Sequence, residues 1–399
     1  MTRTVWTLSL VSLFTDTASE MLYPVLPIYL QSIGFSIVLI GVLEGVAEAT
    51  AGISKGYFGK LSDNSFKRVP FVQIGYALSA ISKPMMAIFT YPLWIFFSRT
   101  IDRLGKGIRT GARDAILSDE ATPETKGRVF GFHRSMDTFG AVLGPLLALL
   151  FLYFYPGHYK TLFYIAFIPG IIAVLTSLYL KEKNPPVQTA KATPPFFSFL
   201  NYWKKSPQIY RKVATGLLVF TLFNSSDVFL LLKAKEAGLS DMLVIGVYIF
   251  YNLIYALFSF PLGIIADKAG LKKMLIFGLF IFATVYFAIS HFSNFYILAA
   301  IFFLYGIYAA ATEGISKAWI SNITAKKDTA TAIGTYAGFQ SICTLLASSL
   351  AGLFWYRFGA SVTFIITGTA TLLVILYFLF YVKDRESKNI MHQQNDNGK

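Results

Sequence analysis

Charged residues are scarce in this chain of 399 residues. Asp, Glu, Lys and Arg make up only 14% of it, whereas soluble globular proteins carry about 25%. Hydrophobic residues account for 55% and aromatic residues for 17%. These proportions exclude a soluble globular domain and predict an integral membrane protein.

Cysteine is almost absent, and so are the motifs of several enzyme classes. The single cysteine, Cys343, excludes an intrachain disulfide. No HExxH motif and no paired CxxC occurs, which argues against a metalloenzyme. No G-x-x-x-x-G-K-[ST] loop occurs, which argues against direct use of ATP. The sequence therefore predicts a protein that is not an enzyme and has no cofactor.

The apolar residues gather in twelve runs that are long enough for transmembrane helices, which need about 20 residues. None of these runs alternates in the way of membrane β-strands. We therefore expect an all-α integral membrane protein with twelve transmembrane helices. The runs lie near residues 5–30, 37–58, 69–90, 92–118, 128–154, 161–180, 211–233, 242–265, 272–291, 295–321, 330–354 and 361–382.

The basic residues predict the orientation of these helices, because cytoplasmic loops are enriched in Lys and Arg. Such residues follow alternate spans, whereas the loops at 31–36 and 90–92 have none. We predict a multi-pass protein of the inner (cytoplasmic) membrane with both termini in the cytoplasm. The net charge of +14 forms no single patch, so no nucleic-acid partner is expected. The basic loop residues are Lys60, Lys67, Arg68, Lys126, Arg128, Lys268, Lys272, Lys273, Lys326 and Lys327.

A polar stretch rich in Pro, Lys and Thr follows the sixth span and marks a linker. It divides the twelve spans into two sets of six. We predict an N-terminal six-helix bundle over 1–180, a cytoplasmic linker over 181–209, a C-terminal six-helix bundle over 210–382, and a disordered cytoplasmic tail over 383–399.

Four acids occupy the first two spans. Asp16 and Glu20 are four residues apart, as are Glu44 and Glu48, so each pair shares one face of a helix. An ionised carboxylate within a span costs about 2.5–3.5 kcal/mol on insertion scales, and such groups usually line the path of a substrate or an ion. We predict that these acids couple protons to a substrate. The alternative is that they are structural partners of buried cations.

The fourth span is the most highly charged. Arg99 and Arg103 form a pair along it, and a second stripe of charged residues follows at spacings of four, three and four. The second stripe consists of Asp102, Lys106, Arg109 and Arg113. We predict that Arg99 and Arg103 take part in coupling by tuning the charge of the acids. The cations of this span need partners within the membrane. The natural candidates are Asp16, Glu20, Asp102 and Asp114.

The fifth span contains a histidine and an acid at helical spacing. His133 and Asp137 are four residues apart, and the side chain of histidine titrates near neutral pH. The pair is therefore a candidate proton relay. A His–Asp pair with a purely structural role is the alternative.

The two halves of the sequence repeat one another. A segment that begins at Gly59 and reaches Asp63 returns at Gly263 and Asp267, with an offset of 267 − 63 = 204 residues. Each copy follows the second span of its half. Two parallel repeats related by an axis along the membrane normal are the plan of one group of transporters.

The repeated segment resembles the loop motif of the major facilitator superfamily, in which a glycine and an aspartate precede a basic cluster. These residues are Gly59, Asp63 and Arg68 in the first copy, and Gly263 and Asp267 in the second. With twelve spans and a central linker, the resemblance covers nearly the whole chain. It implies two pseudo-symmetric six-helix bundles. It also implies a conformational latch, in which Asp63 pairs with a base or a helix N-terminus of the other half.

Two further segments are similar to this family. Arg99 resembles the fourth-helix arginine that many proton-coupled members place near the cavity. Gly140, Gly144 and Pro145 resemble the fifth-helix motif of antiporters, although the terminal glycines of that motif are replaced. This similarity favours export over import.

These features together predict a secondary active transporter that works by alternating access. We expect proton-coupled export of a small molecule, such as a drug or a metabolite, by a monomer in the lipid bilayer. No metal site is assigned. A divalent metal exporter, with Asp16, Glu20, Glu44 and Glu48 as ligands, is the first alternative. A membrane sensor that transports nothing is the second.

Overall fold

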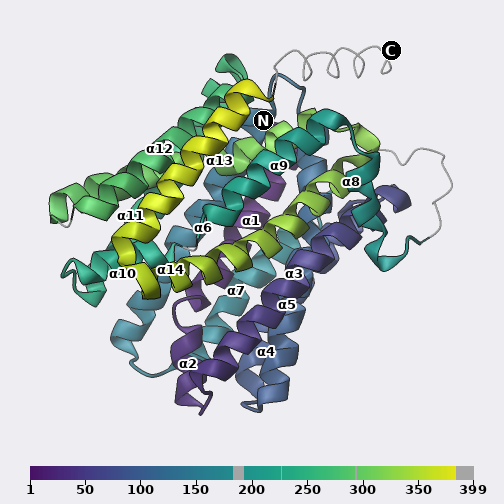
Figure 1. Cartoon of the computed structure of the whole chain (residues 1–399). Coiled ribbons are helices and arrows are strands. Elements are labelled where there is room, and N and C mark those ends of the chain that lie inside the picture. The colour runs from purple at the N-terminus through teal and green to yellow at the C-terminus, as the bar shows by residue number, and fades with distance from the viewer. Residues whose placement is uncertain (183–192, 226, 293, 383–399) are drawn as a thin grey trace. The chain divides into compact units, whose positions relative to one another are not determined.

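The computed structural model of the chain is helical (Figure 1). It describes residues 1–182, 193–225, 227–292 and 294–382. Every regular element within these ranges is an α-helix or a short 3-10 helix, which confirms the all-α expectation there. The predicted tail at 383–399 and residues 183–192 of the predicted linker lie outside the described residues.

The first six expected spans correspond to α1 to α7, and two short helices follow in the expected linker. The first expected span is divided into α1 and α2. The elements are α1 (Arg3–Leu22), α2 (Leu26–Ser32), α3 (Ile37–Ser65), α4 (Val69–Ile88), α5 (Pro92–Asp119), α6 (Lys126–Phe154), α7 (Tyr159–Ser177), η1 (Phe196–Leu200) and α8 (Asn201–Lys205).

The last six expected spans correspond to α9 to α14. The seventh expected span is divided into α9 and α10, and the last two are joined in α14, where Gly359 has a non-helical φ of 82°. The elements are α9 (Gln208–Phe223), α10 (Val228–Glu236), α11 (Asp241–Ala269), α12 (Leu271–His291), α13 (Phe295–Asn322), η2 (Lys326–Asp328) and α14 (Thr329–Phe380).

The first span of each sequence half ends in the same way. A break separates α1 from α2, and an equivalent break separates α9 from α10. The short second helix is followed, two residues after its end, by a glycine with positive φ, 93° at Gly34 and 95° at Gly238, a conformation that glycine adopts without steric cost. The next helix is capped by a serine side chain, Ser36 or Ser240, which accepts a backbone N–H. The sequence repeat is thus also a repeat of local structure.

Within the described residues, six helices are long and apolar enough to cross a membrane. One of them, Lys326–Phe380, contains two of the expected spans. Other expected spans depart from this simple pattern. For example, α9 and α10 have only 16 and 9 residues, and α5 contains buried Arg and Asp side chains.

The chain divides into two compact units. Unit 1 comprises residues 1–120, 136–204 and 326–338, and unit 2 comprises residues 121–135, 205–325 and the chain from 339 onward. The beginnings of α6 and α14 therefore belong to a different unit from the rest of each helix. The domain boundaries proposed from sequence stay predictions.

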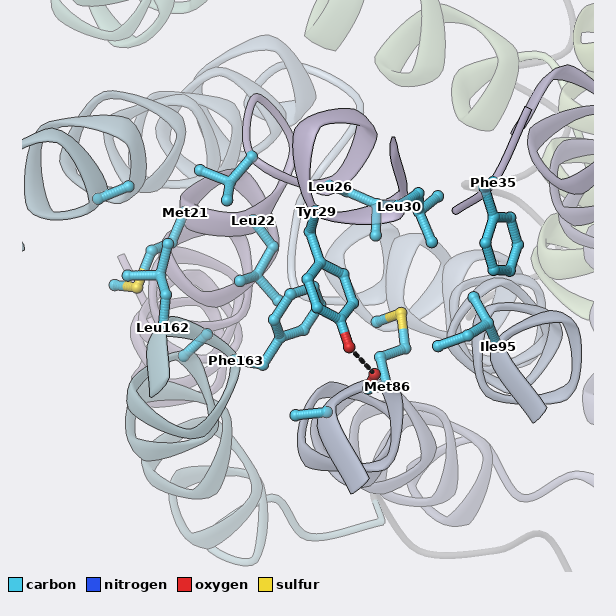
Figure 2. Packing of buried hydrophobic residues seen from close by; sticks show 14 of the residues in the cluster. Met21, Leu22, Leu26, Tyr29, Leu30, Phe35, Met86, Ile95, Leu162 and Phe163 are labelled. Carbon is cyan, nitrogen blue, oxygen red and sulfur yellow. Dashed lines mark hydrogen bonds between the residues drawn. The ribbon is translucent and has the colours of Figure 1, made fainter. Parts of the chain in front are cut away.

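An apolar cluster holds the break between α1 and α2 in unit 1 (Figure 2). The ring of Tyr29 on α2 packs on Phe163 of α7, with the ring centroids 4.9 Å apart. Its hydroxyl donates a hydrogen bond to the carbonyl oxygen of Met86 on α4, at 3.2 Å. The cluster includes Met21 and Leu22, so it fixes the end of α1 directly after Glu20.

Candidate functional site

Small residues place the charged side chains of α5 close to α4. A Cβ atom on Gly105 would lie 2.6 Å from the carbonyl oxygen of Gly75 on α4. Small residues allow helix backbones in membranes to approach one another closely. The side chains of α5 therefore reach partners on the neighbouring helices.

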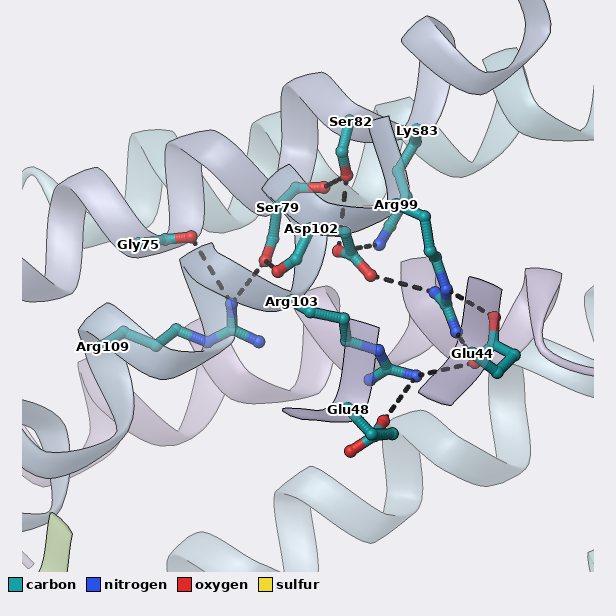
Figure 3. A network of polar contacts seen from close by, with 10 residues as sticks. All are labelled: Glu44, Glu48, Gly75, Ser79, Ser82, Lys83, Arg99, Asp102, Arg103 and Arg109. Atoms are coloured by element: carbon teal, nitrogen blue, oxygen red, sulfur yellow. Dashed lines mark hydrogen bonds and ion pairs between the residues drawn. The ribbon is translucent and has the colours of Figure 1, made fainter. Parts of the chain in front are cut away.

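Arg99 is the centre of a polar network between α3 and α5 (Figure 3). Its Nε and Nη2 atoms donate to the two carboxylate oxygens of Glu44, each at 2.8 Å. Its Nη1 atom donates to Oδ2 of Asp102, one turn further along α5, at 3.1 Å. The planar fork of a guanidinium group suits this two-point binding of a carboxylate. Arg103 forms an ion pair with Glu48 at 3.1 Å.

A lysine that the sequence motifs do not mark completes the network. Lys83 on α4 is only 2% exposed, and it donates to Oδ1 of Asp102 at 2.7 Å. Ser82 donates to the same oxygen at 3.4 Å. A buried ammonium group needs an acidic partner, because its desolvation is costly. One signal in the sequence could have indicated Lys83, because it is the one charged residue in the apolar run of 69–90.

Three of the carboxylates in the membrane helices therefore form ion pairs with Lys or Arg side chains of the protein. Each of these acids lies within ion-pair distance of Arg99, Arg103 or Lys83. The three acids are Glu44, Glu48 and Asp102. Removal of Lys83 or Arg99 would leave the buried charge of Asp102 less well compensated, which is costly. The side chain of Glu48, by contrast, is half-exposed.

Asp16 on α1 lies close to another acid. Its side chain is near that of Asp137 on α6. Asp137 also accepts a hydrogen bond from the hydroxyl of Ser12, and Nη1 of Arg113 lies 4.0 Å from it. Two ionised carboxylates at short range repel one another, and a proton on one of them would allow a hydrogen bond between them. The arrangement is therefore suited to binding a proton.

A cavity of about 40 Å³, lined by polar and apolar side chains, lies beside Asp16 within unit 1. Asp16 and Glu20 of α1 contribute to its walls, as do Arg103 and Lys106 of α5. A cavity of this size and polarity can hold water. The carboxyl group of Asp16 therefore borders a polar space and not only packed apolar side chains.

The glycines of the antiporter-like motif bring α6 close to α1. A Cβ atom on Gly140 would lie 3.1 Å from the Cβ atom of Asp16, and one on Gly144 would lie 2.6 Å from the backbone nitrogen of Met21. Pro145 follows inside α6. This close approach allows the side chain of Asp137, one turn before Gly140, to reach Asp16.

Asp63, in the last turn of α3, binds the N-terminus of α14 within unit 1. Its Oδ2 atom accepts the backbone N–H of Thr331 at 2.7 Å and the hydroxyl of Thr331 at 2.8 Å. Its Oδ1 atom accepts a hydrogen bond from Arg68 at 3.2 Å, and Arg68 also binds Asp119. Free N–H groups and the helix dipole favour a carboxylate at this position.

Asp267, near the end of α11, makes the equivalent contact within unit 2. Its Oδ1 atom accepts the backbone N–H of Gly127 at 2.6 Å, and its Oδ2 atom accepts that of Arg128 at 2.8 Å. Both of these donors lie at the N-terminus of α6. The two copies of the repeated motif thus each place an aspartate on the N-terminus of a helix from the other half of the sequence.

Gly59 and Gly263 allow these two helix contacts. A Cβ atom on Gly59 would lie 3.0 Å from the carbonyl carbon of Ala330, and one on Gly263 would lie 3.0 Å from that of Gly127. Any larger residue at either position would force the backbones apart. The glycine and the aspartate of each motif therefore act at the same contact.

The Asp63 carboxyl lies beyond the expected span of 37–58, at the end of α3. Burial raises the pKa of Asp63 to about 6. The positive charge of Arg68 and the hydrogen bonds from Thr331 act in the opposite direction, but the loss of water around the carboxyl outweighs them.

The sequence matches the profile of the Major Facilitator Superfamily over residues 8–252 and 228–395. The chain belongs to this family. An uncharacterized MFS-type transporter of Methanocaldococcus jannaschii is 32% identical over 386 residues, which are 95% of this chain and 95% of that relative. The protein is therefore a multi-pass membrane transporter and not an enzyme. Its expected fold, with twelve helices in two halves, is confirmed.

Two further similarities extend this assignment. The quinolone resistance protein NorA of Staphylococcus aureus is 26% identical over 208 residues, which are 50% of this chain and 52% of NorA. The crystal structure of the human organic anion transporter MFSD10 superimposes with a TM-score of 0.81 at 16% identity, over 94% of this chain and 99% of that one. At this level of identity, the structural likeness shows the fold alone.

The structure of this MFS transporter groups the candidate residues in a way that the sequence did not predict. Glu44 and Glu48 share one network with Arg99 and Arg103, whereas Asp16 lies against Asp137. No local pattern could have indicated the second pairing, because the two residues are 137 − 16 = 121 positions apart.

The candidate relay lies on α6. His133 is buried there. The contacts described above join Asp137 to Asp16, Ser12 and Arg113. The relay between His133 and Asp137 therefore stays a prediction.

Proposed function

We propose that this MFS transporter exports a small molecule in exchange for protons, by alternating access, as a monomer in the inner (cytoplasmic) membrane with both termini in the cytoplasm. The observation that carries the proposal is the close approach of the Asp16 and Asp137 side chains on α1 and α6, beside a cavity that Asp16 lines. In this proposal, the pair takes up a proton when the substrate leaves and releases it when the next substrate binds.

The surroundings of the pair support a role in proton transfer. Asp16 lies close to Asp137, and it also borders a cavity that reaches Glu20 and Lys106. Water in that cavity provides a path along which a proton moves to and from Asp16. The positive charge of Lys106 favours the state in which the proton has left the pair. Glu44 and Glu48, which bind arginines, would then hold the fourth helix in place and not carry protons.

Export is favoured by two features. Gly140, Gly144 and Pro145 form the antiporter-like motif, and these glycines set the contact of α6 with α1 beside Asp16. A relative that matches half of the chain is named for quinolone resistance. A drug or a metabolite is therefore the proposed substrate.

The two alternatives have less support. Among the residues that the structure describes, no group of three His, Cys, Asp or Glu side chains is placed to hold a metal ion. Glu44 and Glu48, two of the four acids considered as metal ligands, form ion pairs with arginines. Membership of a transporter family argues against a sensor that transports nothing.

Transport in proteoliposomes with an imposed pH gradient tests the proposal. Fluorescent dyes and fluoroquinolones serve as probes, and the wild-type protein should move at least one of them against its gradient. Asp16→Asn and Glu20→Gln should each abolish this pH-driven movement while the protein still inserts. Glu124→Gln, at an exposed loop position, is the matched control and should transport normally. Undiminished transport by both Asp16→Asn and Glu20→Gln would refute the assignment.

A further inference from the structure

Asp227 is a partly buried acid at the break between α9 and α10 in unit 2. Its Oδ1 atom accepts a hydrogen bond from the hydroxyl of Tyr305 on α13 at 2.5 Å. Its Oδ2 atom accepts one from the hydroxyl of Tyr251 on α11 at 2.6 Å. The end of the broken seventh span is therefore tied to two neighbouring helices through one carboxyl group.

The partners of Asp227 are neutral. In the described part of the chain, no Lys, Arg or His side chain forms an ion pair with it. Lys233, the first base that follows along α10, pairs with Glu236 at 3.5 Å. The other titratable groups that face Asp227 are Tyr286 on α12 and Tyr308 and Glu313 on α13.

The repeat shows how different this environment is from the one in the first half. With the offset of 204, the position of Glu44 corresponds to Tyr248, since 44 + 204 = 248, and that of Glu48 corresponds to Asn252. Asp102 has Lys83 and Arg99 as partners, whereas Asp227 has two phenols. Among the described residues, this partly buried carboxyl group of the second half has no Lys, Arg or His side chain as a partner.

Such a carboxyl group needs a positive charge from outside the fold. An ionised acid within a membrane span is costly unless a cation compensates it. A proton removes the charge without requiring additional space. The tyrosine hydroxyls suit both states, because a hydroxyl donates to an ionised carboxylate and accepts from a protonated one.

We infer that Asp227, held by Tyr251 and Tyr305, is a second proton-binding site of this transporter, in the C-terminal half. A proton from hydronium binds one carboxylate oxygen, and water is released. One tyrosine hydroxyl then changes from donor to acceptor, and the hydrogen bonds lose their charge-assisted strength. Protonation therefore changes the hydrogen bonds that join the α9–α10 break to helices α11 and α13.

Infrared difference spectroscopy of the full-length protein in lipid vesicles tests this site. The carbonyl band of protonated carboxyl groups is followed between about pH 5 and about pH 9. One component of the band should appear as the pH falls in the wild-type protein and be missing in Asp227→Asn. Glu236→Gln, a half-exposed acid on the same short helix, is the matched control and should keep that component.

A tyrosine variant provides a second readout. Tyr305→Phe removes one donor to the ionised carboxylate, so half of the component should form at a pH about one to two units higher, since a hydrogen bond to a charged group is worth about 1.5–3 kcal/mol. A structural role for Asp227 would not produce a titrating band. Tyr305→Phe also tests whether Asp227 binds a proton if Asp227→Asn does not reach the membrane.

Two results would overturn the inference. One is a titrating component that persists in full in Asp227→Asn, and the other is a wild-type spectrum in which no component is sensitive to position 227 or 305. The use of this site in transport rests on the proposed function, but proton binding does not. A titrating Asp227 in a protein that moves no probe would refute the proposed function and leave this site intact.

Discussion

Replacement of Gly59 with alanine should weaken the contact between α3 and the start of α14. The added Cβ would lie 3.0 Å from the carbonyl carbon of Ala330, inside the distance of about 3.5–4.0 Å at which carbon atoms pack. The two backbones must therefore separate. Overpacking of this kind costs about 1–3 kcal/mol. Because 1.4 kcal/mol is a factor of ten, the open state of this contact should gain about 5- to 150-fold in population.

A buried thiol reports this opening. Ser62 is fully buried at the end of α3, so Ser62→Cys in a Cys343→Ser background introduces the only thiol of the chain at the contact. Its rate of reaction with a polar maleimide is proportional to the open population while the closed state dominates. Gly59→Ala should raise this rate about 5- to 150-fold.

Gly45→Ala on the same helix is the matched control. A Cβ atom at position 45 meets no atom within 4 Å, so the labelling rate should change by less than about twofold, as for a compatible Gly→Ala replacement. Equal labelling rates in Gly59→Ala and Gly45→Ala would refute the reasoning. The steric contact would then not determine how readily α3 and α14 separate.

Three further changes test the contacts described above. The pKa of Asp63 is raised to about 6 in the closed contact, so the closed state binds a proton more tightly than an open state in which this carboxyl is solvated. Lowering the pH from about 7 to about 5 should therefore slow labelling at position 62, measured relative to an exposed reference thiol. Asp63→Asn should remove this pH dependence. Arg99→Ala should lower the free energy of unfolding, measured by thermal unfolding in detergent, by about 3–5 kcal/mol. Glu48→Gln changes a side chain that is 52% exposed, so it should lower this free energy by less than about 1 kcal/mol. Phe199→Ala removes a buried ring that packs on α3 and should lower the free energy of unfolding by about 3–5 kcal/mol. Phe197→Ala, at a position that is 62% exposed, should change this free energy little. Equal melting temperatures of the two variants would contradict the packing role of Phe199.

The architecture of this transporter was predictable because its signals are local. A membrane helix satisfies its own backbone hydrogen bonds, so an apolar run of sufficient length specifies a helix wherever it lies in the chain. Duplication of the Gly59–Asp63 motif at Gly263–Asp267 indicated the two halves. The breaks after α1 and α9 were not predicted, because Pro24 and the polar residues at 224–227 stand inside otherwise apolar runs.

The roles of the charged residues depended on tertiary structure. The sequence by itself determined that acids and bases lie within the membrane and must be paired, because an isolated charge there is too costly. It did not determine the pairs, since a contact between helices depends on their distance and rotation. Only the tertiary structure showed that Lys83 binds Asp102, that Asp16 lies close to Asp137, and that Asp227 has tyrosines as its partners.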